Sequence, residues 1–232
     1  MAGIELRGLA SRDDVISMFN SVRFGGLSLM ENYSAVGAEL MLYSILNYAY
    51  ERGLPVLVED IFDAFAGYIR HFEVMGLTPP MEHVGVLKVG GVDEVGHVVD
   101  RVKFEADPTL YLQKKERAIS RAMGDDRYVY VVTGFERILG FQRDVKGIYV
   151  IVNHLRESLG NNKRMTFNII EGHVISGFPT NPLPLLEGVA TSVVEFHDHG
   201  DMLRLKFKKS IFTLLEGRDE VFLQPADVVG WW

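Results

Sequence analysis

The sequence predicts an α/β fold in three layers, with a mostly parallel sheet between helices and a C-terminal antiparallel hairpin extension. Two observations support this fold class. Short apolar segments alternate along the chain with longer segments whose apolar residues recur at helical spacing, which is typical of a parallel sheet covered by helices. After residue 192 the period changes to two residues around a polar turn, which indicates a half-exposed antiparallel pair.

Five segments have the unbroken hydrophobicity of buried parallel strands, at residues 27–30, 55–58, 84–89, 128–132 and 165–170. The stretch 92–103 fits a strand or a short helix. In the hairpin, Leu203, Leu205 and Phe207 alternate with charged residues. We therefore expect these three side chains to face the core and the residues between them to face solvent.

Helical spacing predicts helices at residues 11–22, 37–52, 60–76, 107–123, 145–159 and 183–189. Ser11, Asp60 and Asp107 stand at N-cap positions, and a proline follows Asp107 at the first helical position. The segment 37–52 is apolar almost all round, so this helix should be buried on several sides. A loop at 31–36 and a turn at 134–137 complete the expected order.

Composition and charge exclude several classes of function. The formal net charge is −7, which disfavours nucleic acid and anionic membrane surfaces. The absence of cysteine excludes disulfides, thiolate zinc sites and cysteine nucleophiles. No apolar run approaches the ~18 residues of a membrane span, and the first residues lack a signal peptide's apolar core. We expect a cytoplasmic protein.

The domain organisation follows from the same pattern. We expect a helical extension at 1–22, one α/β domain at 23–225 and an apolar tail at 226–232. The tail ends in Trp231 and Trp232, whose exposure to water would be unfavourable. These two rings should therefore fold back onto the domain or dock on a neighbour.

The order of these elements resembles the KaiC-like branch of the RecA-type ATPases over roughly residues 23–225. Residues 51–60 resemble the family's second strand, which ends in acidic residues, and 128–132 resemble its Walker B strand. Residues 190–208 resemble the terminal hairpin, whose return strand carries a Lys-x-Arg pair. The layout also resembles a small archaeal family of unknown function. The resemblance implies a RecA/KaiC-like fold with a phosphate loop after the first strand.

The phosphate loop of that family is lost in this sequence. A phosphate loop reads G-x-x-x-x-G-K-[ST], because its backbone, lysine and hydroxyl hold the phosphates and magnesium. The corresponding run, residues 32–39, retains only Gly37; Ala38 replaces the lysine and Glu39 replaces the hydroxyl. The Walker B aspartate position holds Thr133. We therefore expect neither nucleotide hydrolysis nor a cofactor.

The backbone donors of the empty loop still need partners. Asn32 and Ser34 are short polar residues that can bond the loop backbone, and Glu39 lies in the first helical turn. We expect these three side chains to replace the phosphate internally and close the site.

Other functional residues have both a structural and a catalytic interpretation. Glu59 and Asp60 follow a strand and could form a residual general base or cation site, but a helix cap with an acidic first turn is favoured. Lys206 and Lys208 match the family's trans-acting pair that reaches a neighbour's nucleotide. With no phosphate loop opposite them, the solvated face of a hairpin is favoured.

Two groups of residues could bind a metal. His197, Asp198 and His199 lie in the polar turn at 197–201, and imidazole and carboxylate suit zinc or nickel. An ordinary turn is favoured, because ligands so close in sequence rarely converge alone. The acidic and histidine residues at 93–100 would share a face only on a helix.

The sequence is thus interpreted as a non-catalytic KaiC-like protein that acts through protein contacts, as a regulator or assembly partner or by self-association. Two alternatives remain at this point. The first is a divergent nucleotide-binding ATPase that uses Glu59. The second is a metal-dependent hydrolase that uses the turn at His197 to His199.

Overall fold

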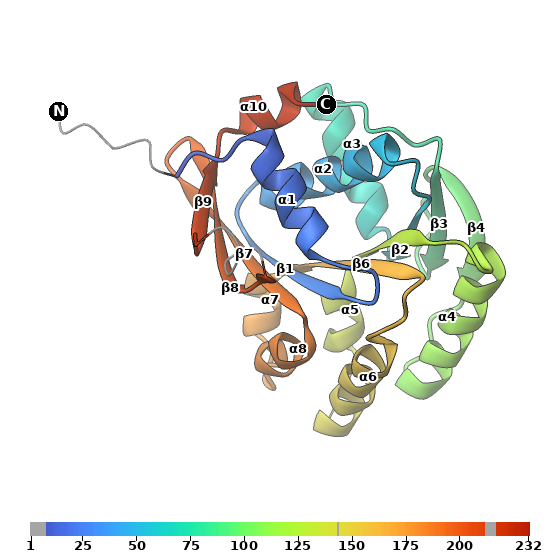
Figure 1. Ribbon diagram of the computed structural model, residues 1–232. Coiled ribbons are helices and arrows are strands. Elements are labelled where there is room, and N and C mark those ends of the chain that lie inside the picture. The colour runs from blue at the N-terminus through green and yellow to red at the C-terminus, as the bar shows by residue number, and fades with distance from the viewer. Residues whose placement is uncertain (1–7, 143, 212–216) are drawn as a thin grey trace.

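One sheet organises the protein. The computed structural model describes residues 8–142, 144–211 and 217–232. The strands within these residues are β1 (Leu27–Tyr33), β2 (Val56–Ile61), β3 (Val84–Val89), β4 (His97–Val102), β5 (Tyr128–Thr133), β6 (Arg164–Glu171), β7 (Ser192–His199), β8 (Met202–Lys209) and β9 (Glu220–Leu223). They form one sheet in the order β4-β3-β2-β5-β6-β1-β7-β8-β9 (Figure 1). From β4 at one edge of the sheet as far as β7, all neighbouring strands in this order are parallel. Strand β8 pairs antiparallel with β7, and β9 pairs antiparallel with β8.

Helices cover both faces of the sheet (Figure 1). One face carries α1 (Arg12–Ser21), α2 (Gly37–Glu51), α3 (Ala64–Met75) and α10 (Pro225–Gly230). The opposite face carries α4 (Pro108–Met123), α5 (Phe135–Gly140), α6 (Val145–Ser158), α7 (Gly172–Ser176) and α8 (Leu183–Val189). The predicted three-layer α/β class with a C-terminal antiparallel extension is confirmed.

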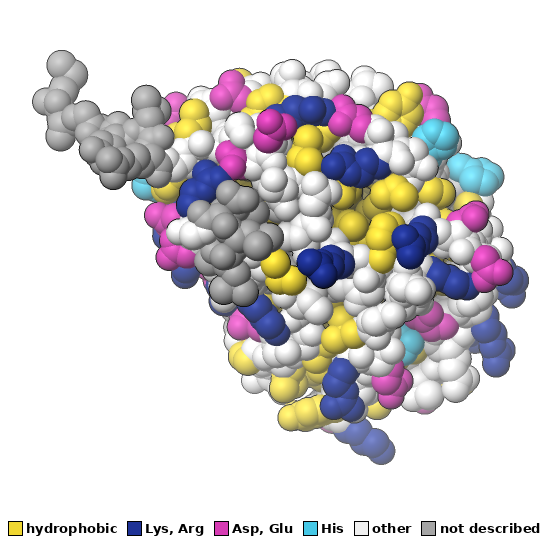
Figure 2. Space-filling model, in the orientation of Figure 1, with side chains coloured by type: hydrophobic (Ala, Val, Ile, Leu, Met, Phe, Trp, Pro, Cys, Tyr) yellow, Lys and Arg dark blue, Asp and Glu magenta, His cyan; other side chains and the backbone are white. Residues whose placement is uncertain are grey.

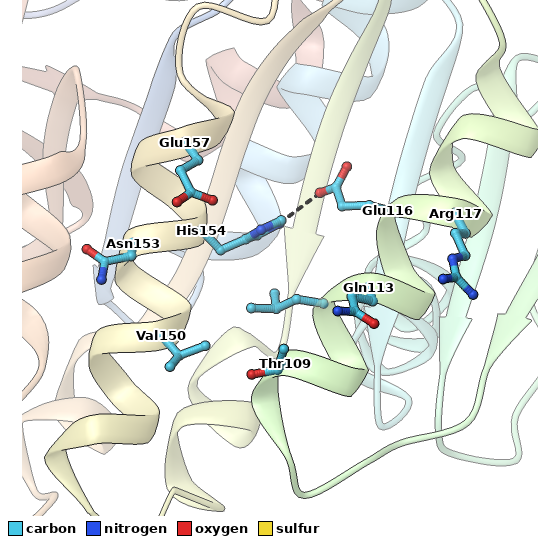
Figure 3. A pocket seen from close by; sticks show the side chains of 9 residues that line it. Thr109, Gln113, Glu116, Arg117, Val150, Asn153, His154 and Glu157 are labelled. Atoms are coloured by element: carbon cyan, nitrogen blue, oxygen red, sulfur yellow. Dashed lines mark hydrogen bonds and ion pairs between the residues drawn. The ribbon is translucent and has the colours of Figure 1, made fainter.

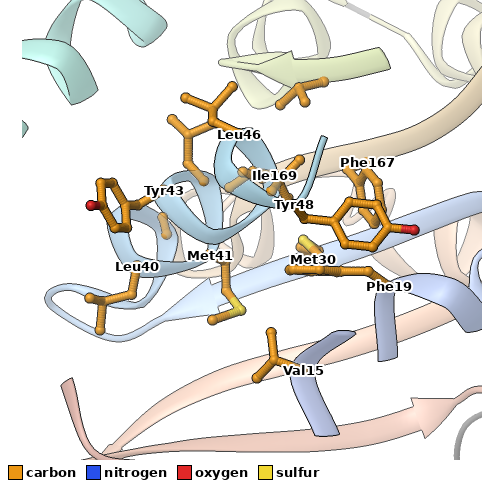
Figure 4. Close-up of a cluster of buried hydrophobic side chains, with 14 of the residues drawn as sticks. Val15, Phe19, Met30, Leu40, Met41, Tyr43, Leu46, Tyr48, Phe167 and Ile169 are labelled. Atoms are coloured by element: carbon orange, nitrogen blue, oxygen red, sulfur yellow. The ribbon is translucent and has the colours of Figure 1, made fainter. Parts of the chain in front are cut away.

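Each face has its own hydrophobic core. Strand residues alternate between them, so Val58 enters one core and Leu57 the other. On the α2 side the ring of Phe19 packs edge-on against Tyr48 and Phe167, at centroid distances of 5.1 and 5.6 Å (Figure 4). Helix α1 is therefore built into this core.

The main predicted elements agree with the structure, including the buried helix α2 and the hairpin. Leu203, Leu205 and Phe207 are buried, as expected. Trp231 and Trp232 pack against the α2-side core, so the tail folds back. Of the expected extension at 1–22, residues 1–7 lie outside the described residues.

Several boundaries were predicted wrongly. Strand β1 continues to Tyr33, so the loop after it is shorter than expected. Asp60 is inside β2, and α3 begins only at Ala64, after Phe62 and Asp63 turn the chain with φ of 51° and 65°. The expected turn at 134–137 is the start of α5, and the ambiguous stretch contains β4. Within the described ranges no helix combines the length and the hydropathy that crossing a membrane requires.

Candidate functional site

The loop between β1 and α2 lies where open α/β sheets place their ligand sites, at the carboxyl ends of parallel strands. β1 pairs with β6 on one side and with β7 on the other. Side chains at the ends of β6 and β7 therefore reach the same loop from both sides. The partner of Tyr33 in β7 is His197, which places Asp198 one residue beyond this pair.

The hydroxyl of Ser34 occupies the middle of the loop. Its Oγ accepts hydrogen bonds from the backbone N–H groups of Val36, at 3.2 Å, and Gly37, at 3.1 Å. The Ser34 backbone N–H in turn donates to Asn32 Oδ1, at 3.2 Å. Asn32 and Ser34 thus bond the loop backbone as the sequence predicted.

Asp198 completes this arrangement. One carboxylate oxygen accepts the Ser34 hydroxyl, and the other accepts the backbone N–H of Ala35 at 3.2 Å. The N–H groups of residues 34 to 37 are therefore all bonded to side chains of this chain. The Asp198 carboxylate thus joins the loop to the end of β7.

Gly37 is explained by packing at the start of α2. A Cβ atom at this position would lie 2.9 Å from Cβ of Phe196 and 3.0 Å from Cβ of Ser34. Real Cβ atoms essentially never approach so closely, so the neighbouring strand leaves room only for glycine. Packing against β7 and the loop thus accounts for the glycine at this position.

Glu39 has a different partner from the one the sequence suggested. It lies in the first turn of α2 and is only 8% exposed. Its carboxylate lies 2.7 Å from Nδ1 of His71 on α3, and Asn32, Ser34 and Asp198 supply the bonds to the loop. Glu39 therefore links the first turn of α2 to α3 through His71.

Two further glutamates surround this edge of the sheet. Asn32 Nδ2 donates to both carboxylate oxygens of Glu171, at 3.0 and 3.2 Å, and the Tyr68 hydroxyl donates at 3.3 Å. Burial raises the pKa of Glu171, and it also raises the pKa of Glu136 on α5. The charge of Glu171 adds to the rise at Glu136, so the two carboxyl groups at this edge are electrostatically coupled.

Glu59 points to the other face of the sheet. It is fully buried and accepts hydrogen bonds from the hydroxyls of Tyr111 and Tyr130, while Lys115 Nζ lies 3.7 Å away. Burial raises the pKa of Tyr111 well above its ordinary value, and the charge of Glu59 raises it further. In this geometry Glu59 is enclosed and presents no carboxylate to a substrate.

Asp60 and Thr133 also make hydrogen bonds inside the protein. Asp60 accepts the backbone N–H of Phe65 at 2.9 Å and pairs with Lys88 Nζ at 2.6 Å. It thus bonds the first turn of α3 from within β2, although it is not the cap residue. Thr133 Oγ1 donates to the carbonyl of Glu59 at 3.1 Å, which ties β5 to β2.

The hairpin lysines are paired within the chain. Lys208 Nζ lies 3.2 Å from Glu195 and 3.5 Å from the fully buried Glu31. Burial would lower the pKa of Lys208, but hydrogen bonds to Glu187 and Glu195 and nearby carboxylate charges raise it well above its ordinary value. Lys206 Nζ lies 3.4 Å from Glu195.

The two suggested metal groups are dispersed. His197 stacks on Tyr33 and contacts Glu195, and His199 contacts the ring of Phe222, so neither joins Asp198 at the loop. The predicted turn is wrong in extent, because β7 continues through His199. Residues 93–100 do not form the helix that their cluster required. Among the residues that the structure describes, no three histidine or carboxylate side chains are placed to hold a metal.

Sequence reasoning missed Asp198 as a loop partner, and it missed Glu171 and Glu136 altogether. The only available signal for Asp198 was the order of the strands, because pairing β7 beside β1 brings residues 164 positions apart into contact. Glu171 could have been noticed as the carboxyl end of the fifth predicted strand.

Solved structures share this fold. The protein PH0250 of Pyrococcus horikoshii is 26% identical, with a TM-score of 0.72 over 87% of this chain and 93% of that one. The flagellar accessory protein FlaH of Methanocaldococcus jannaschii is 12% identical, with a TM-score of 0.59 and 88% of each chain covered. PH0321 of P. horikoshii, solved in complex with an unknown peptide, is 13% identical, with a TM-score of 0.59 over 80% of this chain and 84% of that one.

The last two similarities show a common fold, and they support the RecA-like class expected from the order of elements. None of the curated proteins compared with the chain gives a significant match. A family model described as a Pyrococcus protein of unknown function, DUF257, matches residues 17–219. The chain therefore belongs to the DUF257 family.

Proposed function

We propose that this protein is a non-catalytic member of the RecA-like fold whose nucleotide-phosphate site is closed, and that it acts through protein contacts as a regulatory or assembly partner. It works without a nucleotide cofactor, in the cytoplasm, and not on nucleic acid or membranes. On the face that Figure 2 shows, the Lys and Arg side chains lie singly among apolar ones and do not merge into one continuous basic patch, which supports the exclusion of nucleic acid for this face.

One observation carries the loss of nucleotide binding. The backbone N–H groups of residues 34 to 37 donate to Asn32, Ser34 and Asp198. A phosphate would have to replace these acceptors, each of which contributes about 0.5–1.5 kcal/mol. It would gain no lysine, because Ala38 stands in that position, and it would meet the negative charge of Glu39.

The proposed role in protein contacts rests on the retained fold and on its exposed apolar side chains. The fold is kept with two complete cores, and large apolar side chains stay exposed outside them. PH0321, which shares this fold, was solved in complex with an unknown peptide. We extend to this chain the capacity of such a fold to hold another polypeptide.

Calorimetric titration with Mg-ATP at millimolar concentration tests the proposed loss of nucleotide binding. We expect no saturable heat for the wild type or for Glu39→Lys, which restores a cation but leaves Ser34 and Asp198 in the loop. Micromolar affinity in the wild type would support the divergent ATPase instead.

Cross-linking of the tagged chain in the cells that express it tests the proposed role in protein contacts. We expect one stoichiometric partner, either another protein or a second copy. Recovery of the chain uniformly free and monomeric would remove the partner role while leaving the loss of nucleotide binding intact.

A further inference from the structure

Several arginines on the side of the molecule that carries α1 and α2 lie over aromatic rings. The distances from the guanidinium carbon to the ring centroid are 4.0 Å for Arg52 over Tyr48, 4.3 Å for Arg12 over Trp232 and 5.2 Å for Arg127 over Phe24. A guanidinium over a ring face is attracted by the negative charge of the π system, which holds the side chain in place. We call these three pairs, together with the neighbouring Arg23, the arginine strip.

Printed contacts join the pairs into one surface. The ion pair of Arg12 with Glu51 places Arg12 at the end of α2, next to Arg52 in the sequence. Nη2 of Arg52 donates to Oδ1 of Asn20 at 3.3 Å, near the C-terminal end of α1. Four residues later the chain reaches the ring beneath Arg127. The strip therefore extends from the last residues of the chain to the beginning of β5.

Three arginines of the strip keep their charge available. Arg23, Arg52 and Arg127 are exposed, and within the described part of the chain none of the three is paired with a carboxylate. The hydrogen bond of Arg52 goes to a neutral amide. Stacking on a ring restricts Arg52 and Arg127 before anything binds, so less conformational entropy is lost when they meet an anion.

The neighbouring carboxylates do not cancel this charge. Glu51 is already bound to Arg12, and Asp125, before β5, is already bound to Lys163. Asp126, next to Arg127 in the sequence, is exposed and carries one negative charge. Positive charge is thus in excess on this side, although the whole chain has a formal net charge of −7.

Apolar surface lies between the charges. Phe24, Leu54 and Trp232 are only partly buried where they pack against the α2-side core, so part of each side chain faces solvent. On the face that lies over α1 and α2, Figure 2 shows basic side chains standing singly among apolar ones. Such a surface offers separate anion contacts with apolar contacts between them.

We propose that the arginine strip docks an acidic, amphipathic segment of a protein partner. Carboxylates of that segment bind the guanidinium groups of Arg23, Arg52 and Arg127, which can form two parallel hydrogen bonds to one carboxylate. Apolar side chains of the segment contact Phe24 and Leu54. The inference rests on the proposed role in protein contacts and names the surface and the chemistry of the partner.

Charge complementarity selects this occupant. A basic segment would meet the excess positive charge of the strip and would be repelled. A nucleic acid needs a continuous basic surface along its phosphates, whereas here the arginines are separated by apolar groups and the chain as a whole is negative. A short acidic segment meets only the local charge, and it can also cover the apolar groups.

A random peptide library displayed on phage and selected against the full chain supplies a probe of unbiased chemistry. We expect the selected peptides to combine aspartate or glutamate with aromatic or large aliphatic residues. Synthetic copies should lose affinity by about tenfold in Arg52→Gln and in Arg127→Gln, measured by fluorescence anisotropy. Arg52→Lys keeps the charge without the planar fork and should bind with intermediate affinity.

Matched controls are available on the opposite face of the sheet. Arg117→Gln on α4 and Arg156→Gln on α6 change exposed arginines and alter the net charge of the chain by the same amount. Both should bind the peptides as the wild type does, which separates a local contact from a general electrostatic effect. Circular dichroism should show unchanged folding in all five variants.

Three results would overturn the proposal. The selected peptides could be basic or uncharged, or they could lose as much affinity in the control variants as in the strip variants, or no peptide could bind better than millimolar. A single-stranded RNA oligonucleotide that binds as tightly and loses affinity in the same variants would replace the proposed occupant with nucleic acid. A cross-linked partner that remains bound in Arg52→Gln and Arg127→Gln would contradict this surface and leave the role in protein contacts intact.

Discussion

Polar groups are paired differently in two regions of the molecule. The first is the loop after β1, and the second is the open groove between α4 and α6, which is lined by residues such as Glu116 and His154 (Figure 3). In the loop, Ser34 and Asp198 are bonded to neighbouring backbone and side chain, and Glu39 is almost completely buried. In the groove, Glu116 is held by His154 yet still exposed, and Phe141 is half exposed. The polar groups of the loop are thus satisfied within the chain, whereas the groove leaves side chains exposed that a partner molecule can contact.

The difference has a physical origin. The start of a helix carries backbone N–H groups that must be satisfied, and in the loop before α2 acceptors within the chain bond those of residues 34 to 37. The groove is formed by side chains of two helices whose own ends are capped by Asp107 and Asp144. Nothing in the backbone requires it to be filled. Disturbing the closed edge should therefore be costly, and disturbing the groove should not.

The largest effect is expected at Lys88, which is 2% exposed and pairs with the fully buried Asp60 at the same edge of the sheet. Lys88→Met leaves that carboxylate buried without its partner and should lower the free energy of unfolding by about 3–5 kcal/mol. Chemical denaturation measures this. Adding Asp60→Asn should recover part of the loss, whereas Lys114→Met, at an exposed ion pair, should unfold like the wild type. Equal stability of Lys88→Met and Lys114→Met would mean that the edge is open to water.

Gly37→Ala tests the packing of the loop itself. The added methyl group meets Phe196 and Ser34, so the free energy of unfolding should fall by about 1–3 kcal/mol. Gly67→Ala is the matched control, because that helical position has nothing within 4 Å of the new methyl group. It should be neutral or slightly stabilising. A harmless Gly37→Ala would show that the loop has room for a ligand.

Glu31, on the opposite side of β1, should make the free energy of unfolding depend on pH. Burial raises the pKa of Glu31 from 4.5 to about 7, and Glu187 and Glu195 add to this rise against the effect of Lys208. The folded protein therefore keeps a proton that the unfolded chain has released, so stability is lost as pH rises from about 4.5 to about 7. Wild type should lose up to about 3 kcal/mol of unfolding free energy over this window.

Glu31→Gln removes the titrating group and should flatten this part of the stability profile, measured by urea unfolding at a series of pH values. The exposed Glu73→Gln should keep the wild-type slope. An identical slope in Glu31→Gln would assign the pH dependence to other groups.

The smallest effect is expected in the groove. Asn153→Ala changes an exposed side chain that lines the groove between α4 and α6, and it should alter the free energy of unfolding by no more than about 0.5 kcal/mol. Thermal melting checks this before any binding measurement. A loss as large as that of Gly37→Ala would mean that the groove wall supports the fold, and the contrast between the two regions would disappear.

The predictable part of the fold is the part written in local patterns. Strand hydrophobicity located the cores of β2, β3, β5 and β6, and the alternation at Leu203 to Phe207 located the hairpin. The start of α3 was misplaced because the chain turns through Phe62 and Asp63 with positive φ, and no glycine there signals that turn. Helices as short as α5 and α7 leave too few residues for a period to show.

The site was predictable only in part, for a related reason. Asn32 and Ser34 bond backbone close to them in sequence, so their roles could be inferred from residue type and position. Asp198 reaches Ser34 from a strand 164 residues further on, and only the sheet order brings them together. The groove arises from the packing of α4 against α6, which no single segment encodes.

Amide hydrogen exchange at Ala35 and Val36, measured with and without Mg-ATP, tests the closed loop most directly. Val36 is 37% exposed as a residue, yet both N–H groups are hydrogen-bonded to Asp198 and Ser34. We expect both amides to be protected and their rates to be unchanged by nucleotide. Rapid exchange without Mg-ATP, followed by protection when it is added, would show an open loop that binds phosphate and would contradict the account.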